Sequence, residues 1–418
     1  MFGRLLFPLT LIIGLNINAH AQWTPLTSGT THNLRSVYFV TPATGWVVGD
    51  SGTILKTSNA GSTWSAQSSG TRNNLRAIRF TDVNTGWVVG DSGTRLKTIN
   101  GGSSWSAQPI QQNKISLTSI DFLNTNTGWV VGFGIDSTNT YTPPTILKTT
   151  NGGNTWNLQS SFKSGAGLTS VNFIDTNTGC AVGSVVLNTT NGGSIWNEIF
   201  GMGVGGILNS VHSIKPDLVW AVGGLTTGSG RFFTSSGVIM KSSNGGITWT
   251  SQSSGTTNYL YSVKFMDANT GWTVGEGGII LKTTDGGTTW YPLNSTVTSS
   301  LLSIYPVDVN IVYTVGTNGI ILKSVNGGGG APIFGIKKSH SNLILQRDQI
   351  LWYNIATPSP IQILLFDSRG RTTLKLMDGV QALGEHVVDL SSLNLAHGSY
   401  FLDFKADGVR KAMRIEKK

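Results

Sequence analysis

The segment TTDGGTTW, at residues 283–290, combines an acidic side chain, two glycines and several hydroxyl groups. Residues of these types can hold a calcium ion through oxygen atoms, or a phosphate through backbone N–H groups. A phosphate loop also requires a Lys-Ser/Thr pair at the start of a helix, and none follows this segment. Whether the segment is a ligand site or a structural turn depends on how often it occurs.

The segment is repeated along the chain. Its other copies are TSNAGSTW (57–64), TINGGSSW (98–105), TTNGGNTW (149–156), TTNGGSIW (189–196), SSNGGITW (242–249) and SVNGGGG (324–330). Its Asn or Asp stands at Asn59, Asn100, Asn151, Asn191, Asn244, Asp285 and Asn326. Successive copies are 40 to 53 residues apart, which is typical of an array of small β units. We therefore interpret the motif as a structural turn.

Few other residues are candidates for chemistry. Asp121 and His212 stand at variable positions of expected inner strands, and we interpret both as polar residues that line a channel. Four aspartates recur at one turn position and are interpreted as structural: Asp82, Asp175, Asp267 and Asp308. No nucleophile, metal-ligand cluster or phosphate loop has a recognisable spacing. The sequence therefore predicts no catalytic, metal-binding or cofactor-binding residue and no cofactor.

The composition favours many short strands joined by tight turns. Glycine accounts for 54 of the 418 residues and charged residues for only 12%, while 39% of residues are hydrophobic. The net charge of +9 is spread thinly along the chain, so we expect no nucleic-acid partner. The single cysteine, Cys180, excludes an intramolecular disulfide framework and cysteine-rich zinc sites.

Residues 1–21 have the features of a secretory signal peptide. An early arginine precedes an apolar stretch from Leu5 to Leu15, and an Ala-His-Ala sequence ends at Ala21. No later segment is apolar over the length needed to cross a bilayer as a helix, so no transmembrane segment is expected. We expect an exported protein, either extracellular or at the outer-membrane surface.

Each repeat reads as four strands. A Leu-x-Ser/Ala-Val/Ile-x-Phe strand is followed by an Asp-x-Asn-Thr-Gly turn, a Gly-Trp-Val-Val-Gly strand and an Ile-Leu-Lys-Thr strand. The quoted motif is then predicted to be the hairpin turn before the fourth strand. We expect its Asn or Asp to bond to the backbone, its glycines to take special dihedrals, and its tryptophan to be buried with its N–H near a carbonyl.

Seven such units predict an all-β, seven-bladed β-propeller over residues 22–330. The seventh motif lacks its tryptophan, while QWTPLTSGT at the expected mature N-terminus matches WSAQSSGT at residues 64–71. We therefore expect residues 22–29, including Trp23, to form the outer strand of the sheet made by residues 301–326. This strand would close the ring.

The repeat resembles the photosystem II assembly/stability factor-like propellers, within the wider group that carries Asp-box (bacterial neuraminidase) repeats. The resemblance implies that the Asp-box is structural and lies away from the active face. It also implies an arginine patch that meets an anionic partner, here assigned to Arg35, Arg72, Arg76, Arg79 and Arg95. Solvated strand ends are the alternative interpretation of these arginines.

Residues 331–418 break the repeat and alternate as strands. Phe366-Asp367-x-x-Gly370-Arg371, Gly398-x-Tyr400-Phe401-Leu402 and the closing RIEKK resemble the C-terminal sorting domain of type IX secretion substrates, although its usual Tyr-Pro-Asn-Pro entry is absent. The resemblance implies a small β-sandwich that engages the type IX secretion machinery. A carbohydrate-binding or adhesive sandwich is the alternative.

Two enlarged repeats suggest a binding groove. Their extra residues, 132–145 and 223–237, fall between the second and third expected strands, and the repeat between them has only GSVV at 183–186. Four side chains there are suited to grip a peptide or glycan: Tyr141, Arg231, Phe232 and Phe233. Tolerated insertions without a ligand are the alternative.

The sequence therefore predicts a secreted or cell-surface, non-enzymatic propeller that binds a protein or glycan. A glycoside hydrolase or sialidase-like enzyme and an envelope complex assembly factor are the alternatives. A pair of carboxylates facing each other across the channel would favour the hydrolase.

Overall fold

A computed structural model describes most of the chain. The described residues are 23–108, 115–134, 144–159, 167–203, 205–229, 232–328, 342–346, 350–355, 359–381, 384–389, 393, 395–406 and 409–417. The predicted leader, residues 1–21, lies outside them. The chain divides into two compact units, Met1–Ala331 and Pro332–Lys418. Strands dominate both units, as the composition predicts.

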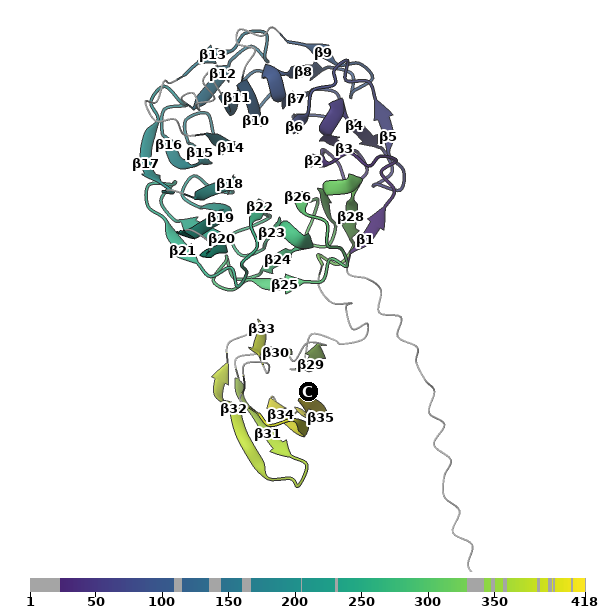
Figure 1. The fold of residues 1–418 in the computed structure, drawn as a ribbon, viewed down its shortest axis with the longest axis vertical. Helices are drawn as coiled ribbons and strands as arrows, with labels where there is room; N and C mark the ends of the chain where they lie inside the picture. The colour runs from purple at the N-terminus through teal and green to yellow at the C-terminus, as the bar shows by residue number, and fades with distance from the viewer. Residues whose placement is uncertain are drawn as a thin grey trace, which may run out of the picture. The chain divides into compact units, whose positions relative to one another are not determined.

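The described part of the first unit contains seven four-stranded antiparallel sheets, arranged in a ring (Figure 1). We number them sheets 1 to 7 by the order of their innermost strands. These innermost strands are β2 (Leu34–Phe39), β6 (Leu75–Phe80), β10 (Ile115–Phe122), β14 (Leu168–Phe173), β18 (Gly206–Ser213), β22 (Leu260–Phe265) and β26 (Leu301–Pro306).

The chain then runs outward through each sheet. The second strands are β3 (Gly45–Gly49), β7 (Gly86–Gly90), β11 (Gly128–Gly134), β15 (Gly179–Gly183), β19 (Val219–Ser229), β23 (Gly271–Gly275) and β27 (Val312–Gly316). The third strands are β4 (Ile54–Thr57), β8 (Arg95–Thr98), β12 (Thr145–Thr149), β16 (Val185–Thr189), β20 (Phe232–Ser242), β24 (Ile280–Thr283) and β28 (Ile321–Ser324). The outermost strands are β5 (Ser65–Gln67), β9 (Ser106–Ala107), β13 (Asn157–Leu158), β17 (Asn197–Gly201), β21 (Thr250–Gln252), β25 (Tyr291–Leu293) and β1 (Thr24–Leu26).

The two ends of the first unit share sheet 7. Strand β1 pairs antiparallel with β28, with Thr24 opposite Lys323 and Leu26 opposite Ile321. Trp23 is fully buried and packs in one cluster with Leu322. The predicted pairing of the N-terminal strand with the strand near residue 320 is therefore confirmed.

The first five residues of the second strand are buried in each of these sheets, because neighbouring sheets cover the strand on either side there. The aromatic residue of this strand is among the largest fully buried side chains of the protein in six sheets: Trp46, Trp87, Trp129, Trp220, Trp272 and Tyr313. Continuous runs of β-branched and aromatic residues suit a strand that is covered on both faces. The core therefore lies between consecutive sheets, in clusters that each draw on two of them.

The turn between the first and second strands forms as the sequence predicts. The carboxylate of Asp82 accepts backbone N–H groups of Asn84 and Thr85, both at 2.8 Å, and the other three recurring aspartates form the same turn. At the opposite end, short 3₁₀ turns join the second and third strands of four sheets. They are η1 (Asp50–Gly52), η2 (Asp91–Gly93), η3 (Glu276–Gly278) and η4 (Thr317–Gly319).

The second unit contains two sheets among its described residues. One is β29 (Asn342–Gln346), β30 (Ile350–Ile355) and β33 (Gly384–Asp389). The other is β32 (Thr372–Gln381), β31 (Ser359–Asp367), β34 (Gly398–Ala406) and β35 (Val409–Lys417). Ile363, Leu402 and Phe404 are fully buried between β31, β34 and their partners. Alternation along β31 and β34 thus places one face of this sheet in a core.

Candidate functional site

The Asp-box motif forms the turn between the third and fourth strands, as predicted. In its first copy the side-chain oxygen of Asn59 accepts the N–H of Thr63 at 2.9 Å, and the hydroxyl of Thr57 accepts the N–H of Gly61 at 2.9 Å. The other copies repeat the hydroxyl-to-glycine bond. Because the polar groups of the turn bond to one another, the motif needs no ligand to be satisfied.

The Asp-box also joins each sheet to the preceding one, a role that sequence reasoning missed. At the joint between sheets 3 and 4, Trp129 donates its Nε1–H to the carbonyl of Gly192 at 3.2 Å, and Lys148 donates to the same oxygen at 2.8 Å. The ring of Trp129 stacks on Phe173 with centroids 3.5 Å apart. The recurring lysine of the third strand was a signal for this joint in the sequence.

This geometry corrects one detail of the predicted turn. The tryptophan N–H that reaches a backbone carbonyl belongs mostly to the second strand, as in Trp87 and Trp220. The Nε1 atoms of the Asp-box residues Trp156, Trp196 and Trp290 have no protein hydrogen-bond partner. Their rings instead meet the inner-strand phenylalanine of their own sheet edge-on.

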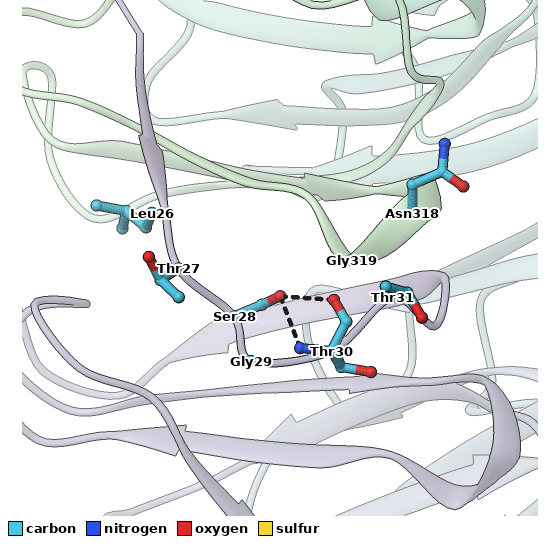
Figure 2. A pocket seen from close by; sticks show the side chains of 8 residues that line it. All are labelled: Leu26, Thr27, Ser28, Gly29, Thr30, Thr31, Asn318 and Gly319. Carbon is cyan, nitrogen blue, oxygen red and sulfur yellow. Dashed lines mark hydrogen bonds between the residues drawn. The ribbon is translucent and has the colours of Figure 1, made fainter.

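A hollow lies where the N-terminal strand leads into sheet 1, and Figure 2 shows its lining from Leu26 to Thr31 together with Asn318 and Gly319. The hydroxyl of Ser28 donates to the carbonyl of Thr30 and accepts its N–H, at 3.1 and 3.3 Å. A Cβ at Gly319 would lie 1.9 Å from that carbonyl. Gly52 and Thr71 make the same close approach in another hollow of the ring, so this feature belongs to the repeated architecture.

The ring's innermost strands enclose a cavity of about 170 Å³, lined by residues of all seven. The third residue of the Leu-x-Ser-Val-x-Phe pattern in each innermost strand forms the first polar layer of the cavity lining. Six serines accept the backbone N–H of the next sheet, at 3.2 to 3.4 Å: Ser36, Ser119, Ser170, Ser210, Ser262 and Ser303. Ala77 holds this place in sheet 2 and has no hydroxyl.

A second polar layer comes from the fifth residue of the same pattern, which we call the fifth-position ring. Its members are Tyr38, Arg79, Asp121, Asn172, His212, Lys264 and Tyr305. Five of them bond to backbone atoms of the following sheet: Arg79, Asp121, Asn172, His212 and Tyr305. These side chains therefore connect consecutive sheets around the cavity, as the aromatic joints do farther out.

The charges of this ring lie close together and shift one another's pKa. Burial, with repulsion from Lys264 and Arg79, lowers the pKa of His212 well below its ordinary value, so its ring is neutral at pH 7. Its Nδ1 accepts the N–H of Phe265 at 3.1 Å, which leaves the proton on Nε2. Burial and repulsion from Arg79 lower the pKa of Lys264 to about 8, although Asp121 opposes the shift.

Asp121 is held on both of its oxygens. Oδ1 lies 3.2 Å from Nε of Arg79, and Oδ2 accepts the N–H of Phe173 at 2.8 Å and the amide of Asn172 at 3.1 Å. Among the described residues that line the cavity, Asp121 is the only one with a carboxylate. A glycosidase requires two carboxyl groups across its site, so these lining residues do not supply that pair. Asp121 lines the cavity, as expected of a polar residue of the channel, whereas His212 is not among the described residues that line it.

Of the five arginines assigned to an anionic-partner patch, three line the central cavity and two lie elsewhere. Arg35 and Arg76 each form an ion pair with the aspartate of the adjacent 3₁₀ turn, Asp50 and Asp91. With Arg79, which pairs with Asp121, they line the cavity. Arg72 is exposed on a loop, whereas Arg95 is buried on β8 with no partner for its Nε.

The enlarged sheets 3 and 5 extend on the same end of the ring. Strands β10 and β11 continue their pairing to Ile115 opposite Gly134, whereas those of sheet 4 stop at Leu168 opposite Gly183. In sheet 5, β19 and β20 pair over eleven positions, up to Ser229 opposite Phe232. The insert that was expected to be a loop is therefore a long antiparallel hairpin.

A tyrosine from sheet 6 supports this hairpin. The ring of Tyr259 lies over Gly224, where an added Cβ would come within 1.2 Å of it. The Tyr259 hydroxyl also bonds to the hydroxyl of Thr226. Only glycine leaves room for the ring at this position, so the base of the hairpin is fixed against its neighbour.

The residues predicted to grip a ligand fall at or beyond the described ends of these extensions. Tyr141 and Arg231 lie outside the described residues. Phe232 and Phe233 open β20, where the backbone pairs with Ser229 and Gly228 at the tip of the hairpin. The backbone positions of two of the four predicted residues are therefore at the end of the β19–β20 pairing.

The described residues contain no group of three or more His, Cys, Asp or Glu side chains arranged to hold a metal ion. Within the same residues, no helix has the length and apolar character required to cross a membrane.

Comparison with known proteins supports the β-propeller architecture. The family model of the photosynthesis system II assembly factor YCF48 matches residues 67–157 and 252–331. No curated protein matches the chain in sequence.

Solved structures agree with that architecture. YCF48 from Cyanidioschyzon merolae is 19% identical, with a TM-score of 0.58, over 73% of this chain and 99% of that one. A structure of YCF48 bound to D1 peptide is 21% identical, with a TM-score of 0.58, over 73% and 98%. The GH74 xyloglucanase from Xanthomonas campestris is 13% identical, with a TM-score of 0.56, over 83% and 58%. At identities this low, the similarity shows a shared fold and does not extend to function.

Proposed function

We propose that this protein is a secreted or cell-surface, non-enzymatic propeller that binds a protein partner through the end of the ring that carries the β19–β20 hairpin. The first unit would be a closed seven-bladed propeller and the second a small β-sandwich. The hairpin carries the proposal, because its strands pair over eleven positions, more than any other second and third strands among the described residues, and Tyr259 holds its base. A rigid element that projects from a scaffold is suited to recognition.

A peptide partner is favoured over a glycan. YCF48, whose family model matches two parts of this chain, has been solved in complex with a D1 peptide. The hairpin offers Phe232 and Phe233 at its tip, and aromatic residues are enriched at protein interfaces. Hydrolysis is not favoured, since the described cavity lining supplies Asp121 without a second carboxylate.

A role as an envelope complex assembly factor is the second candidate. The matched stretches 67–157 and 252–331 favour it, because they belong to an assembly-factor family model. The two candidates differ in the partner, a membrane complex or a surface protein, and not in the binding end of the ring.

Binding is tested with the full chain on peptide and glycan arrays. We expect peptide ligands whose signal falls about tenfold or more in the Phe232→Ala, Phe233→Ala double variant, since aromatic anchors dominate interface energies. The matched control is Ile247→Ala, an exposed apolar residue in the Asp-box turn of the same sheet, at the other end of its third strand. Equal loss in both variants, or a signal confined to glycans, would contradict the proposal.

Export is proposed through the leader at residues 1–21 and the type IX secretion machinery acting on residues 331–418. The support is the sequence resemblance, together with the Asp367 turn, where the carboxylate accepts the N–H groups of Arg369 and Arg371 at 2.9 Å. Deletion of residues 332–418 should retain the protein in the periplasm, as measured by fractionation of cells and medium. Undiminished release of the truncated chain would exclude this route.

A further inference from the structure

Lys264 differs from its neighbours in the fifth-position ring. Its ammonium group lines the cavity and has no hydrogen-bond or ion-pair partner among the described residues. His212 and Asp121 each accept an N–H from the next sheet. An ammonium group cannot accept a hydrogen bond, and the corresponding residue of sheet 7 is Pro306, which has no N–H to offer.

The cavity therefore carries an uncompensated positive charge. Arg79 is balanced by Asp121 at 3.2 Å, and His212 is neutral. Asp121 also attracts Lys264, but one carboxylate cannot neutralise two cations, so this part of the lining keeps one net positive charge, which burial disfavours. An anion bound near its ammonium group would remove this penalty.

The serine layer supplies further donors for an anion. Ser210 and Ser262 each accept a backbone N–H through their oxygen, at 3.2 Å. A hydroxyl that accepts in this way still has one proton to donate. Both serines line the same cavity as Lys264, and so do Ser170 and Ser303. The lining therefore combines one free cation with several hydroxyl donors, which is the donor set that a carboxylate requires.

We propose that the central cavity is a binding site for one small monocarboxylate, held by the ammonium group of Lys264 and the hydroxyls of the serine layer. The volume of about 170 Å³ is below the roughly 300–1,000 Å³ of drug-sized pockets, so the ligand must be small. One positive charge matches one carboxylate. The site is separate from the hairpin and does not depend on the proposed partner.

The first test is a titration of the full chain with ¹³C-acetate, followed by NMR in a buffer free of other carboxylates. We expect saturable binding that weakens about tenfold or more in Lys264→Met, because a hydrogen bond to a charged group is lost. The control is Lys215→Met, which removes an exposed lysine from a turn. Equal binding in all three proteins, or binding of inorganic phosphate in preference to acetate, would overturn the proposal.

A second measurement uses the wild type alone, so it stands even if Lys264→Met does not fold. The pKa of the Lys264 ammonium group, followed by NMR, should rise from about 8 when acetate is saturating, since a bound anion favours the charged form. A pKa that acetate leaves unchanged would exclude the site. The last ligand to be titrated is a glycine peptide with a free C-terminus, because the C-terminal carboxylate of a protein partner has the same charge and donor requirements as acetate. If it binds and acetate does not, the free monocarboxylate is excluded.

Discussion

Two neighbouring joints of the ring are made of different residues. We call the contact between sheets 3 and 4 joint 3/4, and that between sheets 4 and 5 joint 4/5. At joint 3/4, Trp129 stacks on Phe173, and Trp129 and Lys148 both donate to the carbonyl of Gly192. At joint 4/5 all three side chains are replaced. Cys180 stands at the tryptophan position, Asn188 at the lysine position and Ser213 at the phenylalanine position.

Joint 4/5 is filled in another way. Cys180 donates weakly to the carbonyl of Gly245 at 3.6 Å and is buried in an aliphatic cluster with Val186, Leu208 and Val219. Joint 3/4 has an aromatic stack, the Lys148 ammonium group over the Trp129 ring, and two hydrogen bonds to one carbonyl oxygen. In joint 4/5, dispersion contacts between aliphatic side chains take the place of most of these interactions. The comparison teaches that the Asp-box array tolerates a joint without the tryptophan–phenylalanine stack when the three positions differ together; Phe200 and Trp249 still pack against the edge of the aliphatic cluster.

Valine at position 219 is part of the same change. In sheets that carry the inner-strand phenylalanine, a glycine faces its ring, and a Cβ at Gly128 or Gly179 would lie 2.6 Å from it. Sheets 5 and 7 have Ser213 and Pro306 in place of phenylalanine, and there the glycine is replaced by Val219 and Val312. A valine fills the space that the missing ring leaves.

The largest expected effect is the loss of the aromatic joint. Trp129→Ala should lower the free energy of unfolding by about 3–5 kcal/mol, because a buried ring leaves a cavity that its neighbours fill only in part. Cys180→Ala should cost about 1 kcal/mol, a typical value for a point mutation. Urea denaturation measures both. Equal losses would show that the two joints do not differ in energy.

Substitution of the glycine that faces the inner-strand phenylalanine should have the next largest effect. Gly179→Ala should lower the free energy of unfolding by about 1–3 kcal/mol, the usual cost of overpacking, because its Cβ would meet the ring of Phe173. Gly201→Ala is the matched strand control, since a Cβ there has no atom nearer than 3.7 Å. If the control is equally destabilised, backbone freedom and not the ring requires glycine.

Removal of the cation at joint 3/4 should have a smaller effect. Lys148→Met should cost about 1 kcal/mol, the net value of one hydrogen bond, while its methylenes continue to cover Trp129. Thermal denaturation compared with the exposed-site variant Lys215→Met measures it. No difference between these variants would mean that the carbonyl of Gly192 is satisfied by Trp129 alone.

The smallest expected effect is the pH dependence of joint 4/5. Burial raises the pKa of the Cys180 thiol from 9.0 to about 12, so the folded protein keeps a proton that the unfolded chain releases. The thiol's contribution is present below pH 9 and is lost as pH rises through about 12. Stability measured from pH 8 upward should therefore fall less in Cys180→Ala than in the wild type. Parallel curves would contradict the burial of the thiol.

The strand pattern, the two turn types and the pairing of β1 with β28 were predictable because each depends on local or repeated sequence. Asn59 bonds within its own turn. Trp23 occupies the position that a tryptophan holds in the six other copies of the repeat. The long hairpin of sheet 5 was not predictable as strands, since its Gly-, Ser- and Thr-rich sequence has the composition of a loop. Tyr259, which precedes the first strand of sheet 6, packs on Gly224 and bonds to Thr226, a contact that no local sequence pattern reveals.

The sequence by itself determined the repeat, its turns and the strand that the two ends share, because hydrogen bonds between near neighbours and a fixed hydrophobic order specify them. Only the tertiary structure decided which charges meet. Arg79, Asp121 and Lys264 are far apart along the chain, and they come together because the ring places the same strand position of every sheet around one cavity. Which cation is paired depends on what the ring brings next to it: Asp121 lies beside Arg79, whereas Lys264 has no hydrogen-bond or ion-pair partner among the described residues.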